Sequence, residues 1–296
     1  MSATILDGNE ISAGMREEMR QEVADLKARY NVVPGLAVVL VGEDPASLSY
    51  VKGKQLACEK IDIFSREHHL EANVPEEHLL GLIRELNEDS QIHGILVQLP
   101  LPDGHSESRV LNAINPSKDV DGLHPVNLGR MVRQEEGFLP CTPHGVKHIL
   151  IRSGIEVSGK HVVTVGRSIL VGRPIANILT QKGDGANATV TMCHTGTPDI
   201  GAHTRMADIL IVAANQPNII EASMVSAGTV VIDVGVERVK DSSRKRGYRL
   251  TGNVDFDRVK EKAAAITPVP GGVGPMTITM LLFNTILSAK RSVGFD

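Results

Sequence analysis

The sequence predicts a two-domain α/β protein whose second domain has a Rossmann-like parallel sheet. The chain has 296 residues, which is more than one hydrophobic core usually fills. Short aliphatic runs bounded by glycines, typical of parallel strands buried on both faces, alternate with segments of helical periodicity. The stretch from His161 to Pro174, HVVTVGRSILVGRP, indicates a strand, a glycine turn and a helix, a geometry that aims backbone N–H groups at a phosphate.

The composition excludes several classes of protein. Net charge is −4, so no basic balance points to nucleic acid, and aromatic residues make up only 3%, with no Trp to stack on bases. Three widely spaced cysteines fit neither a disulfide framework nor a structural zinc site. Asp7 and Glu10 stand where a secretion signal would be apolar, and the apolar run at 276–289 contains Asn284 and is too short for a membrane span. These features predict a cytoplasmic protein.

The first domain begins as a strand, helix, helix and strand, an α/β unit that follows an amphipathic helix at residues 12–30. The predicted segments, in that order, are a strand at 35–42, helices at 47–61 and 78–89, and a strand at 92–100. Residues 114–131 are dense in Pro, Gly, Asn and Asp and are predicted to form a loop.

A connecting helix leads into the second domain. Thr142 is its predicted N-cap, Pro143 its first residue and Gly154 its end. Four strands are expected after it, at 161–165, 188–194, 207–214 and 228–235. Helices are expected between and after them, at 174–182, 200–206 and 222–225.

The chain ends with a surface excursion and a buried helix. Residues 236–250 are charged and rich in turn-forming residues, whereas a glycine loop precedes an apolar helix that starts at Pro275. This last helix is expected to return to the first domain. The predicted domains are therefore 1–140 with 275–296, and 141–274.

The glycine turn is a weak pattern by itself. Gly166 and Gly172 are separated by five residues, so the segment is neither Gly-x-Gly-x-x-Gly nor a P-loop, and a plain strand-to-helix turn remains an alternative. Arg167 and Ser168 stand where a phosphate would lie. This position favours binding of a dinucleotide.

The end of the second strand of this domain favours NADP over NAD. His194 and Thr195 follow that strand, where NAD-preferring sites usually carry a carboxylate for the ribose 2′-OH. Arg167 supplies a cation that suits a 2′-phosphate. Asp199 lies four residues beyond Thr195, so NAD stays open as an alternative.

A second group of polar residues lies in the first domain. Tyr50 and Lys54 share one face of a predicted helix, although a lysine there is often simply solvated. Gln98 is the only polar side chain in GILVQLPLP; it is either a core residue or points from a strand end into a cleft. Asp119 and Asp121 flank Val120 and, taken alone, are typical of turn or cap residues.

Six motifs in order resemble one family, that of bifunctional methylenetetrahydrofolate dehydrogenase/methenyltetrahydrofolate cyclohydrolase. They are ASLSYVKGK, GILVQLPLP, PSKDVDGLHPVN, PCTPHG, VGRSILVGRP and PVPGGVGPMT. The resemblance covers nearly the whole chain. It implies two α/β domains with a cleft between them, a homodimer formed through the cofactor domain, and a place in one-carbon metabolism and purine biosynthesis.

The resemblance also implies residue roles. In the first domain, Lys54 would be the key catalytic residue of the cyclohydrolase step, with Gln98 as its partner, Tyr50 packing on the folate and Asp121 holding the pterin. The glycine loop, with Pro270, Gly271 and Gly272, would pass the folate. The cofactor would be NADP, contacted by Gly166, Arg167, Ser168, Gly172, His194 and Thr195, with Arg167 on the 2′-phosphate.

Three positions depart from the family pattern, and they keep an alternative open. Leu56 stands where a second Lys is frequent, Asp62 where Gly is common, and Asn253 where Asp is usual. Leu56 bears on the strength of the cyclohydrolase activity, so the alternatives are a monofunctional dehydrogenase, which could use NAD, and a non-catalytic nucleotide-binding module. No metal site is predicted, and His68 and His69 are expected to be solvated.

Overall fold

The computed structural model describes residues 2–244 and 247–294. The chain divides into two compact units. The three-stranded unit comprises Ala13–Cys141 and Ile278–Asp296, and the six-stranded unit comprises Met1–Ser12 and Thr142–Thr277. Helices α1 (Gly8–Tyr30) and α10 (Val273–Ser292) each contribute residues to both units.

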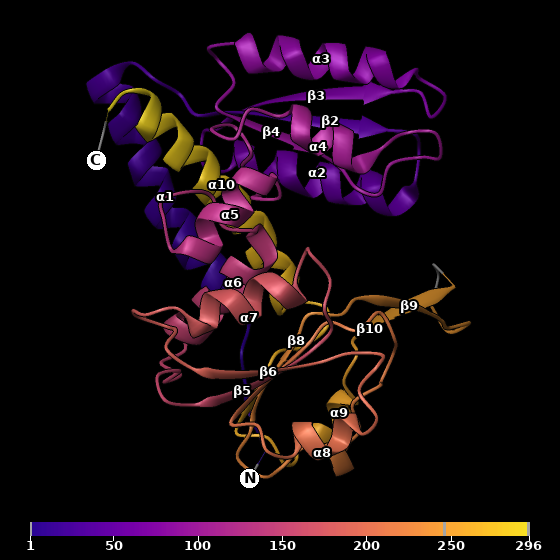
Figure 1. The fold of residues 1–296 in the computed structure, drawn as a ribbon. Helices are drawn as coiled ribbons and strands as arrows, with labels where there is room; N and C mark the ends of the chain where they lie inside the picture. Colours follow the sequence, from indigo (N-terminus) through magenta and orange to yellow (C-terminus); the bar gives the residue numbers. More distant parts are fainter. Residues whose placement is uncertain (1, 245–246, 295–296) are drawn as a thin grey trace. The chain divides into compact units, whose positions relative to one another are not determined.

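The three-stranded unit is built on a parallel sheet of order β3-β2-β4. Its strands are β2 (Gly35–Val41), β3 (Phe64–Leu70) and β4 (Gly94–Val97). Every residue of β2 and β4 is buried, as expected for aliphatic runs covered on both faces. Figure 1 shows α2 (Pro45–Glu59) and α3 (Glu76–Glu88) on opposite sides of this sheet.

Strand β3 and its histidines differ from the sequence prediction. Strand β3 is absent from that prediction, because the sequence FSREHHL lacks the apolar character of a central strand, and β3 is an edge strand paired only with β2. The histidines of β3 also differ from expectation. His68 is half-buried, and the Nε2 atom of His69 lies 2.9 Å from the Gly42 carbonyl oxygen. The expectation of solvation was therefore wrong for His68, whereas His69 is exposed but contacts the backbone.

The stretch predicted as a loop at 114–131 contains most of a helix, α5 (Pro125–Arg133). Pro125 occupies its first turn, where the missing N–H costs nothing, and the Nδ1 atom of His124 accepts from the Val126 N–H. The proline marks the start of a helix here rather than a break. Another short helix, α4 (Glu107–Ala113), was not predicted.

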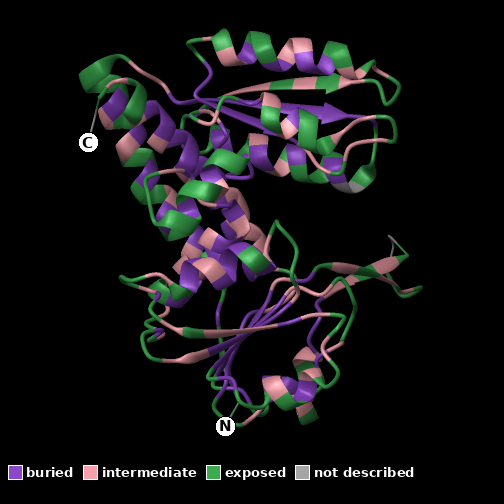
Figure 2. Cartoon of the chain, viewed as in Figure 1, coloured by how far each residue is buried: buried purple, intermediate pink, exposed green. Residues whose placement is uncertain are grey.

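The six-stranded unit has a parallel sheet of order β1-β11-β8-β7-β5-β6. The four strands predicted in this unit are present as β5 (His161–Val165), β6 (Thr189–Cys193), β7 (Ile209–Val212) and β8 (Val230–Asp233). The residues of β7 and β8 are all buried, and Figure 2 shows the buried strands running through the middle of this unit.

The two remaining strands of this sheet were not predicted. They are β1 (Thr4–Ile5) and β11 (Ala265–Ile266), whose two residues each give too little pattern to recognise. Because β1 pairs with β11, residues 1–12 belong to the six-stranded unit, whereas the sequence grouped them with the first domain.

Helices and a hairpin complete the six-stranded unit. They are α6 (Cys141–Arg152), α7 (Gly172–Thr180), α8 (Ile200–Thr204), the 3₁₀ turn η1 (Ala222–Met224), α9 (Phe256–Val259), and the hairpin of β9 (Glu237–Lys240) and β10 (Tyr248–Thr251). Helix α6 begins at Cys141, one residue before the predicted cap at Thr142. Across the described ranges, every helix is too short or too polar to cross a membrane.

Candidate active site

Lys54 is a buried lysine held by a neutral partner. It lies on α2, where Asp44 caps the first turn by accepting from the Ser47 N–H, and only 8% of the residue is exposed. Its Nζ donates to the Oε1 atom of Gln98 at 2.9 Å. Gln98 follows directly after β4, and its own Nε2 donates to the Leu99 carbonyl at 2.8 Å, which fixes the orientation of the amide. The two residues that the family resemblance pairs are therefore in contact.

The surroundings of Lys54 tune its proton affinity in two directions. Burial lowers the pKa of Lys54 below its ordinary value, because the charged ammonium is poorly solvated there. The nearby Asp121 carboxylate is the main opposing influence and raises the pKa, with smaller contributions from Cys141 and Cys58. A lysine in this setting can gain and lose a proton more readily than a solvated one.

The loop that carries Asp121 is braced by Asp119. The Asp119 carboxylate accepts from the N–H groups of Leu123 and His124, at 3.1 and 2.8 Å, and from the Asn127 side chain at 2.8 Å. Asp119 is only 1% exposed, and this burial outweighs the hydrogen bonds and raises its pKa to about 6. The interpretation of Asp119 as a turn residue is confirmed. Asp121 is half-buried, with its carboxylate close enough to act on Lys54.

Tyr50 stands one helical turn before Lys54 on α2. It is 46% exposed, unlike Lys54, so its ring offers an open surface beside the buried amine. An aromatic ring in such a position can stack on a flat ligand.

The glycine turn follows β5 as the sequence predicts. Gly166 has φ +124°, a conformation that side chains rarely adopt, and a Cβ atom there would lie 2.1 Å from the Ala213 carbonyl oxygen. A Cβ atom on Gly172 would lie 2.1 Å from the Gly166 carbonyl oxygen. Both glycines are thus required by close backbone packing between the turn and its neighbours.

Helix α7 begins at Gly172, two residues before the predicted start at Pro174. The reason is Ser168, whose Oγ accepts from the N–H groups of Val171 and Gly172, at 3.1 and 3.5 Å, and so satisfies part of the first turn. Arg167 and Ser168 are exposed. The turn therefore presents a cation and a hydroxyl to solvent at the carboxyl end of a parallel strand, where ligands bind in such sheets.

His194 and Thr195 follow β6, the strand next to β5. The His194 Nδ1 atom accepts from the Gly196 N–H at 3.0 Å, which turns the ring toward its own loop. Asp199 caps α8 by accepting from the Ala202 N–H at 2.9 Å. Asp199, the carboxylate for which NAD stayed an alternative, therefore already accepts a hydrogen bond as the cap of α8.

The segment with Pro270, Gly271 and Gly272 lies in the six-stranded unit. Gly271 has φ +108°, and the Asn9 side chain donates to its carbonyl at 3.4 Å. A Cβ atom on Gly8 would lie 1.7 Å from the Gly272 carbonyl oxygen, so this loop is pressed against the start of α1. The glycines permit a backbone course that other residues would block.

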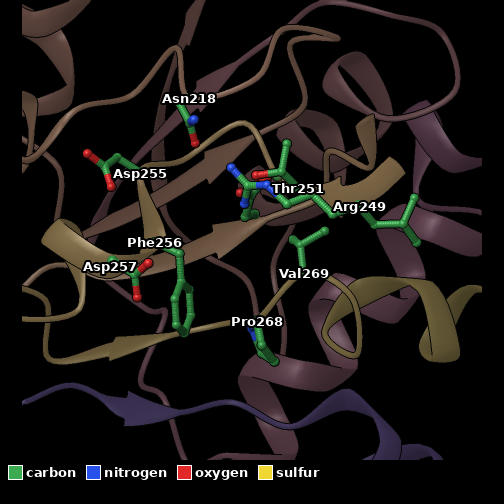
Figure 3. Close-up of a pocket in the computed structure, with 11 residues that line it drawn as sticks. Asn218, Arg249, Thr251, Asp255, Phe256, Asp257, Pro268 and Val269 are labelled. Atoms are coloured by element: carbon green, nitrogen blue, oxygen red, sulfur yellow. The ribbon is translucent and has the colours of Figure 1, made fainter. Parts of the chain in front are cut away.

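A polar pocket of about 250 Å³ opens beside this segment (Figure 3). Figure 3 shows Pro268 and Val269, which precede the glycine loop, together with Thr251 from β10 and the side chains of Asp255 and Phe256. None of the residues proposed from the sequence lines this pocket. Over the described part of the chain, no group of three or more His, Cys, Asp or Glu residues is placed to hold a metal ion.

The sequence missed two residues that support Asp121. Cys141 donates from its N–H to the Asp121 carbonyl at 3.3 Å, and Asn284 on α10 donates to the Val120 carbonyl at 2.8 Å. Asn284 was noted from the sequence only as a polar residue within the apolar run at 276–289. Because a buried polar group needs partners, the same feature could have indicated a supporting role.

Comparison with known proteins agrees with this geometry. Residues 6–121 match the catalytic domain of the tetrahydrofolate dehydrogenase/cyclohydrolase family, and residues 140–293 match its NAD(P)-binding domain. The chain is 59% identical to "Bifunctional protein FolD" of Dehalococcoides mccartyi (strain CBDB1) over 294 residues, which is 99% of each chain.

Solved structures extend this likeness to the fold. The bifunctional enzyme FolD of Campylobacter jejuni has a TM-score of 0.92 and 47% identity, covering 98% of this chain and 100% of that one. FolD of Trypanosoma brucei, solved with NADP cofactor and an inhibitor, has a TM-score of 0.94 and 41% identity over 99% of both chains. The chain therefore belongs to the tetrahydrofolate dehydrogenase/cyclohydrolase family.

Proposed function

We propose that this protein oxidises 5,10-methylenetetrahydrofolate to 5,10-methenyltetrahydrofolate with NADP, and then hydrolyses that product to 10-formyltetrahydrofolate. The observation that carries the second activity is the buried Lys54 held by Gln98, within the part that matches the family's catalytic domain. Relatives at 59% and 52% identity are named as bifunctional, which favours this function over a monofunctional dehydrogenase.

The glycine turn fits a dinucleotide cofactor. When bound, NADP accepts a hydride directly from the methylene carbon, a step that needs close alignment rather than an acid or base. Gly166 and Gly172 let the backbone approach a phosphate, and Ser168 and Thr195 can donate hydroxyl hydrogen bonds to it. Arg167 is assigned to the 2′-phosphate. His194 completes this set at the end of β6.

Lys54 is assigned the proton transfers of the hydrolytic step. Water adds to the methenyl carbon and loses a proton, which gives a neutral carbinolamine. The C–N bond to one ring nitrogen then breaks as that nitrogen gains a proton and the hydroxyl group loses its proton to become the formyl C=O, so that one proton is released overall. A lysine with a lowered pKa can accept the first proton and return the second. Gln98 holds the amine without titrating itself.

Asp121 and Tyr50 are assigned to the folate. The Asp121 carboxylate can accept two hydrogen bonds from the 2-aminopyrimidine edge of the pterin, and the exposed Tyr50 ring can pack on it. Pro270, Gly271 and Gly272 would pass the folate, where the absence of side chains allows a close approach. We further propose that the three-stranded unit is the folate-binding and catalytic domain, and that the six-stranded unit binds the dinucleotide.

The division of roles is tested with Lys54→Ala. Hydrolysis of methenyltetrahydrofolate should fall to the buffer rate, whereas substantial hydride transfer should remain, because only hydrolysis needs the lysine. Lys52→Ala, at an exposed lysine on the same helix, is the matched control and should leave both rates near those of the unaltered protein. Equal loss of both activities in folded Lys54→Ala protein would contradict this assignment. An unaltered protein that never hydrolyses the methenyl compound faster than buffer would instead be a monofunctional dehydrogenase.

The cofactor assignment is tested with Arg167→Ala. This variant should raise the Michaelis constant for NADP far more than that for NAD, because only NADP carries the 2′-phosphate. Arg258→Ala, at an exposed arginine of the same unit that pairs with Asp255, is the control. A comparable effect of Arg167→Ala on both cofactors would remove Arg167 from the 2′-phosphate.

We also propose a cytoplasmic homodimer that supplies one-carbon units for purine biosynthesis. Free Cys58, Cys141 and Cys193 suit a reducing compartment. Strand β6 lies at the edge of its sheet and is only partly buried, so a second copy could cover that face. Sedimentation over a range of protein concentrations would measure the stoichiometry, and a monomer at all concentrations would contradict the dimer.

A further inference from the structure

Asn284 is a buried amide in the apolar helix α10 of the three-stranded unit. The residue is 1% exposed, and its Nδ2 donates to two carbonyl oxygens, those of Val120 at 2.8 Å and Leu139 at 3.1 Å. Val120 directly precedes Asp121 in the chain. One side chain, distant in sequence from both, therefore joins two separate backbone segments beside the proposed pterin ligand.

The same two segments are also joined to each other. The Cys141 N–H donates to the Asp121 carbonyl at 3.3 Å, and the Cys141 thiol donates to the Val120 carbonyl at 3.3 Å. Gly122 has φ +72°, and a Cβ atom on it would lie 2.5 Å from the Leu139 carbonyl carbon. Residues 120–122 and 139–141 are thus packed backbone to backbone. The Asn284 side chain donates a hydrogen bond to each of these two segments.

This packing bears on the Asp121 side chain. Burial and the neighbouring Asp121 charge raise the pKa of the Cys141 thiol, and the same charge acts on Lys54. A shift of the Val120–Asp121 backbone therefore moves the carboxylate relative to both neighbours. Interactions that orient a ligand-binding group from behind commonly affect function as strongly as direct contacts do.

We propose that Asn284 is a positioning residue, which sets the place of the Asp121 carboxylate by fixing the Val120 and Leu139 carbonyls. This inference rests on the proposed function, in which Asp121 holds the pterin. Asn284 itself touches neither the folate nor the cofactor in this assignment. Its loss should therefore weaken folate binding through Asp121 and leave the dinucleotide site in the other unit unaffected.

Ser288 provides a matched control on the same helix. It lies one turn beyond Asn284, is 7% exposed, and its Oγ donates to the carbonyls of His93 and Ser117, at 2.6 and 2.9 Å. Ser288→Ala therefore also removes a buried donor shared by two carbonyls. It differs from Asn284→Ala in that neither carbonyl adjoins Asp121.

The first measurement is the Michaelis constant of the full-length enzyme for 5,10-methylenetetrahydrofolate and for NADP. Asn284→Ala should raise the folate constant about tenfold to a hundredfold, as expected for a displacement of the order of 1 Å, and change the NADP constant less than about twofold. Ser288→Ala should change both less than about threefold. Equal effects of the two variants on the folate constant would overturn the proposal.

The second measurement is the pH profile of methenyltetrahydrofolate hydrolysis, which loss of stability alone would not move. The ionisable groups acting on Lys54 are Asp121, Cys58 and Cys141, and Asp121 is the strongest of them. A displaced Asp121 holds the lysine proton less firmly, so the midpoint of the profile should move toward acid in Asn284→Ala and stay in place in Ser288→Ala. An unmoved midpoint, with a folate constant that also stays unchanged, would refute the positioning role.

A variant that does not fold, and a failure of the proposed function itself, can each be told apart from a failure of the role of Asn284. Should Asn284→Ala not fold, Asn284→Asp keeps the size of the side chain but cannot donate to two carbonyls as a carboxylate, and it should show the same folate-selective loss. An unaltered protein that fails to oxidise 5,10-methylenetetrahydrofolate would reject the proposed function itself, whereas an active protein with indifferent Asn284 variants would reject only the role of Asn284.

Discussion

Replacing Gln98 with glutamate should move the pH dependence of the hydrolytic step toward alkali. The Oε1 atom of Gln98 lies 2.9 Å from the Lys54 Nζ, so the introduced side chain would set a carboxylate against the ammonium in nearly the same geometry. The added charge favours the protonated lysine. If hydrolysis needs neutral Lys54, the rate near neutral pH should fall and recover as the pH rises.

The size of the effect follows from the charge separation. Two unit charges 4 Å apart attract by about 4 kcal/mol at an effective dielectric constant of about 20. Desolvation of the new carboxylate, at a half-buried position, removes part of this gain. Since about 1.4 kcal/mol corresponds to one pH unit, the midpoint of the rate profile should rise by about one to three pH units.

Gln98→Met provides the opposite perturbation. Methionine has a similar length but accepts no strong hydrogen bond, so the buried ammonium loses a partner and the midpoint should move toward acid. Leu56→Glu adds the same charge on an exposed part of α2, where Leu56 is 48% exposed, and should leave the midpoint nearly unchanged.

The assay is the decay of methenyltetrahydrofolate absorbance across the neutral and alkaline range, after subtraction of the buffer rate. Hydride transfer, measured in parallel as NADPH formation, should change much less, because it involves no proton transfer by Lys54. Displacement of the Gln98→Glu and Gln98→Met midpoints in the same direction, in folded proteins, would refute the reasoning. So would a midpoint that neither variant moves.

Three other substitutions test backbone conformation at two positions and the burial of a carboxyl group at a third. Gly166→Ala should destabilise the protein by at least about 2 kcal/mol and abolish NADP binding, because of φ +124° and the Ala213 carbonyl, as denaturant unfolding and a cofactor titration would show. Asp62→Gly should stabilise the protein by about 0.5–1 kcal/mol in the same unfolding assay, since Asp62 has φ +60° and glycine adopts that conformation freely. The pKa of Asp119 is about 6 in the folded protein and about 3.9 when unfolded, so its contribution to stability is complete below about pH 4 and is lost as the pH rises through about 6, a loss of roughly 3 kcal/mol. Asp119→Asn should remove that part of the pH dependence, and a difference between the two proteins that stays constant from acid to neutral pH would contradict the value.

Much of the six-stranded unit could be predicted because its strands are aliphatic and its turns are marked by glycine. β5 has the predicted bounds, and β7 and β8 lie inside the predicted segments. Such strands are buried on both faces, so each appears in the sequence as a continuous apolar run. The turn at Gly166 was also predictable from local sequence, because its φ of +124° is a conformation that residues other than glycine rarely adopt.

Prediction failed where structure depends on partners distant in the chain. Strand β3 is polar, and it forms because its backbone pairs in parallel with β2 along Gly35–Val41. Strands β1 and β11 contain two residues each and are defined only by pairing with each other and with β8. Local pattern carries no information about such pairings, because the energy lies in contacts made after the chain has folded.

The site residues show the same division. Tyr50 and Lys54 share a helix face, which spacing alone predicts, and Gln98 stands at a strand end, where ligands commonly bind. That Lys54 donates to Gln98 depends on the placement of α2 against β4, and the role of Asn284 depends on α10. Residue types and spacing could therefore indicate the chemistry, whereas the support of the site required the structure.

The three departures from the family pattern can now be judged by position. Leu56 is two residues from Lys54 on an α-helix, so the two side chains point to different faces; Leu56 is 48% exposed while Lys54 is buried. A cation at 56 would be screened by water, and its absence has little influence on the amine. Asp62 occupies a left-handed conformation, which accounts for a frequent glycine there by backbone geometry alone.

Asn253 is the departure with the most demanding surroundings. Its Oδ1 accepts from the Ala214 N–H at 2.8 Å, and its Nδ2 donates to the Gln216 carbonyl at 2.9 Å, so the position uses both an acceptor and a donor. An amide supplies both at any pH, whereas a carboxyl supplies both only when protonated. Asn253 also donates from its backbone N–H to Asp233, whose pKa burial raises to about 6. Asparagine therefore satisfies the strand ends of the six-stranded unit without placing a second carboxylate beside a buried one.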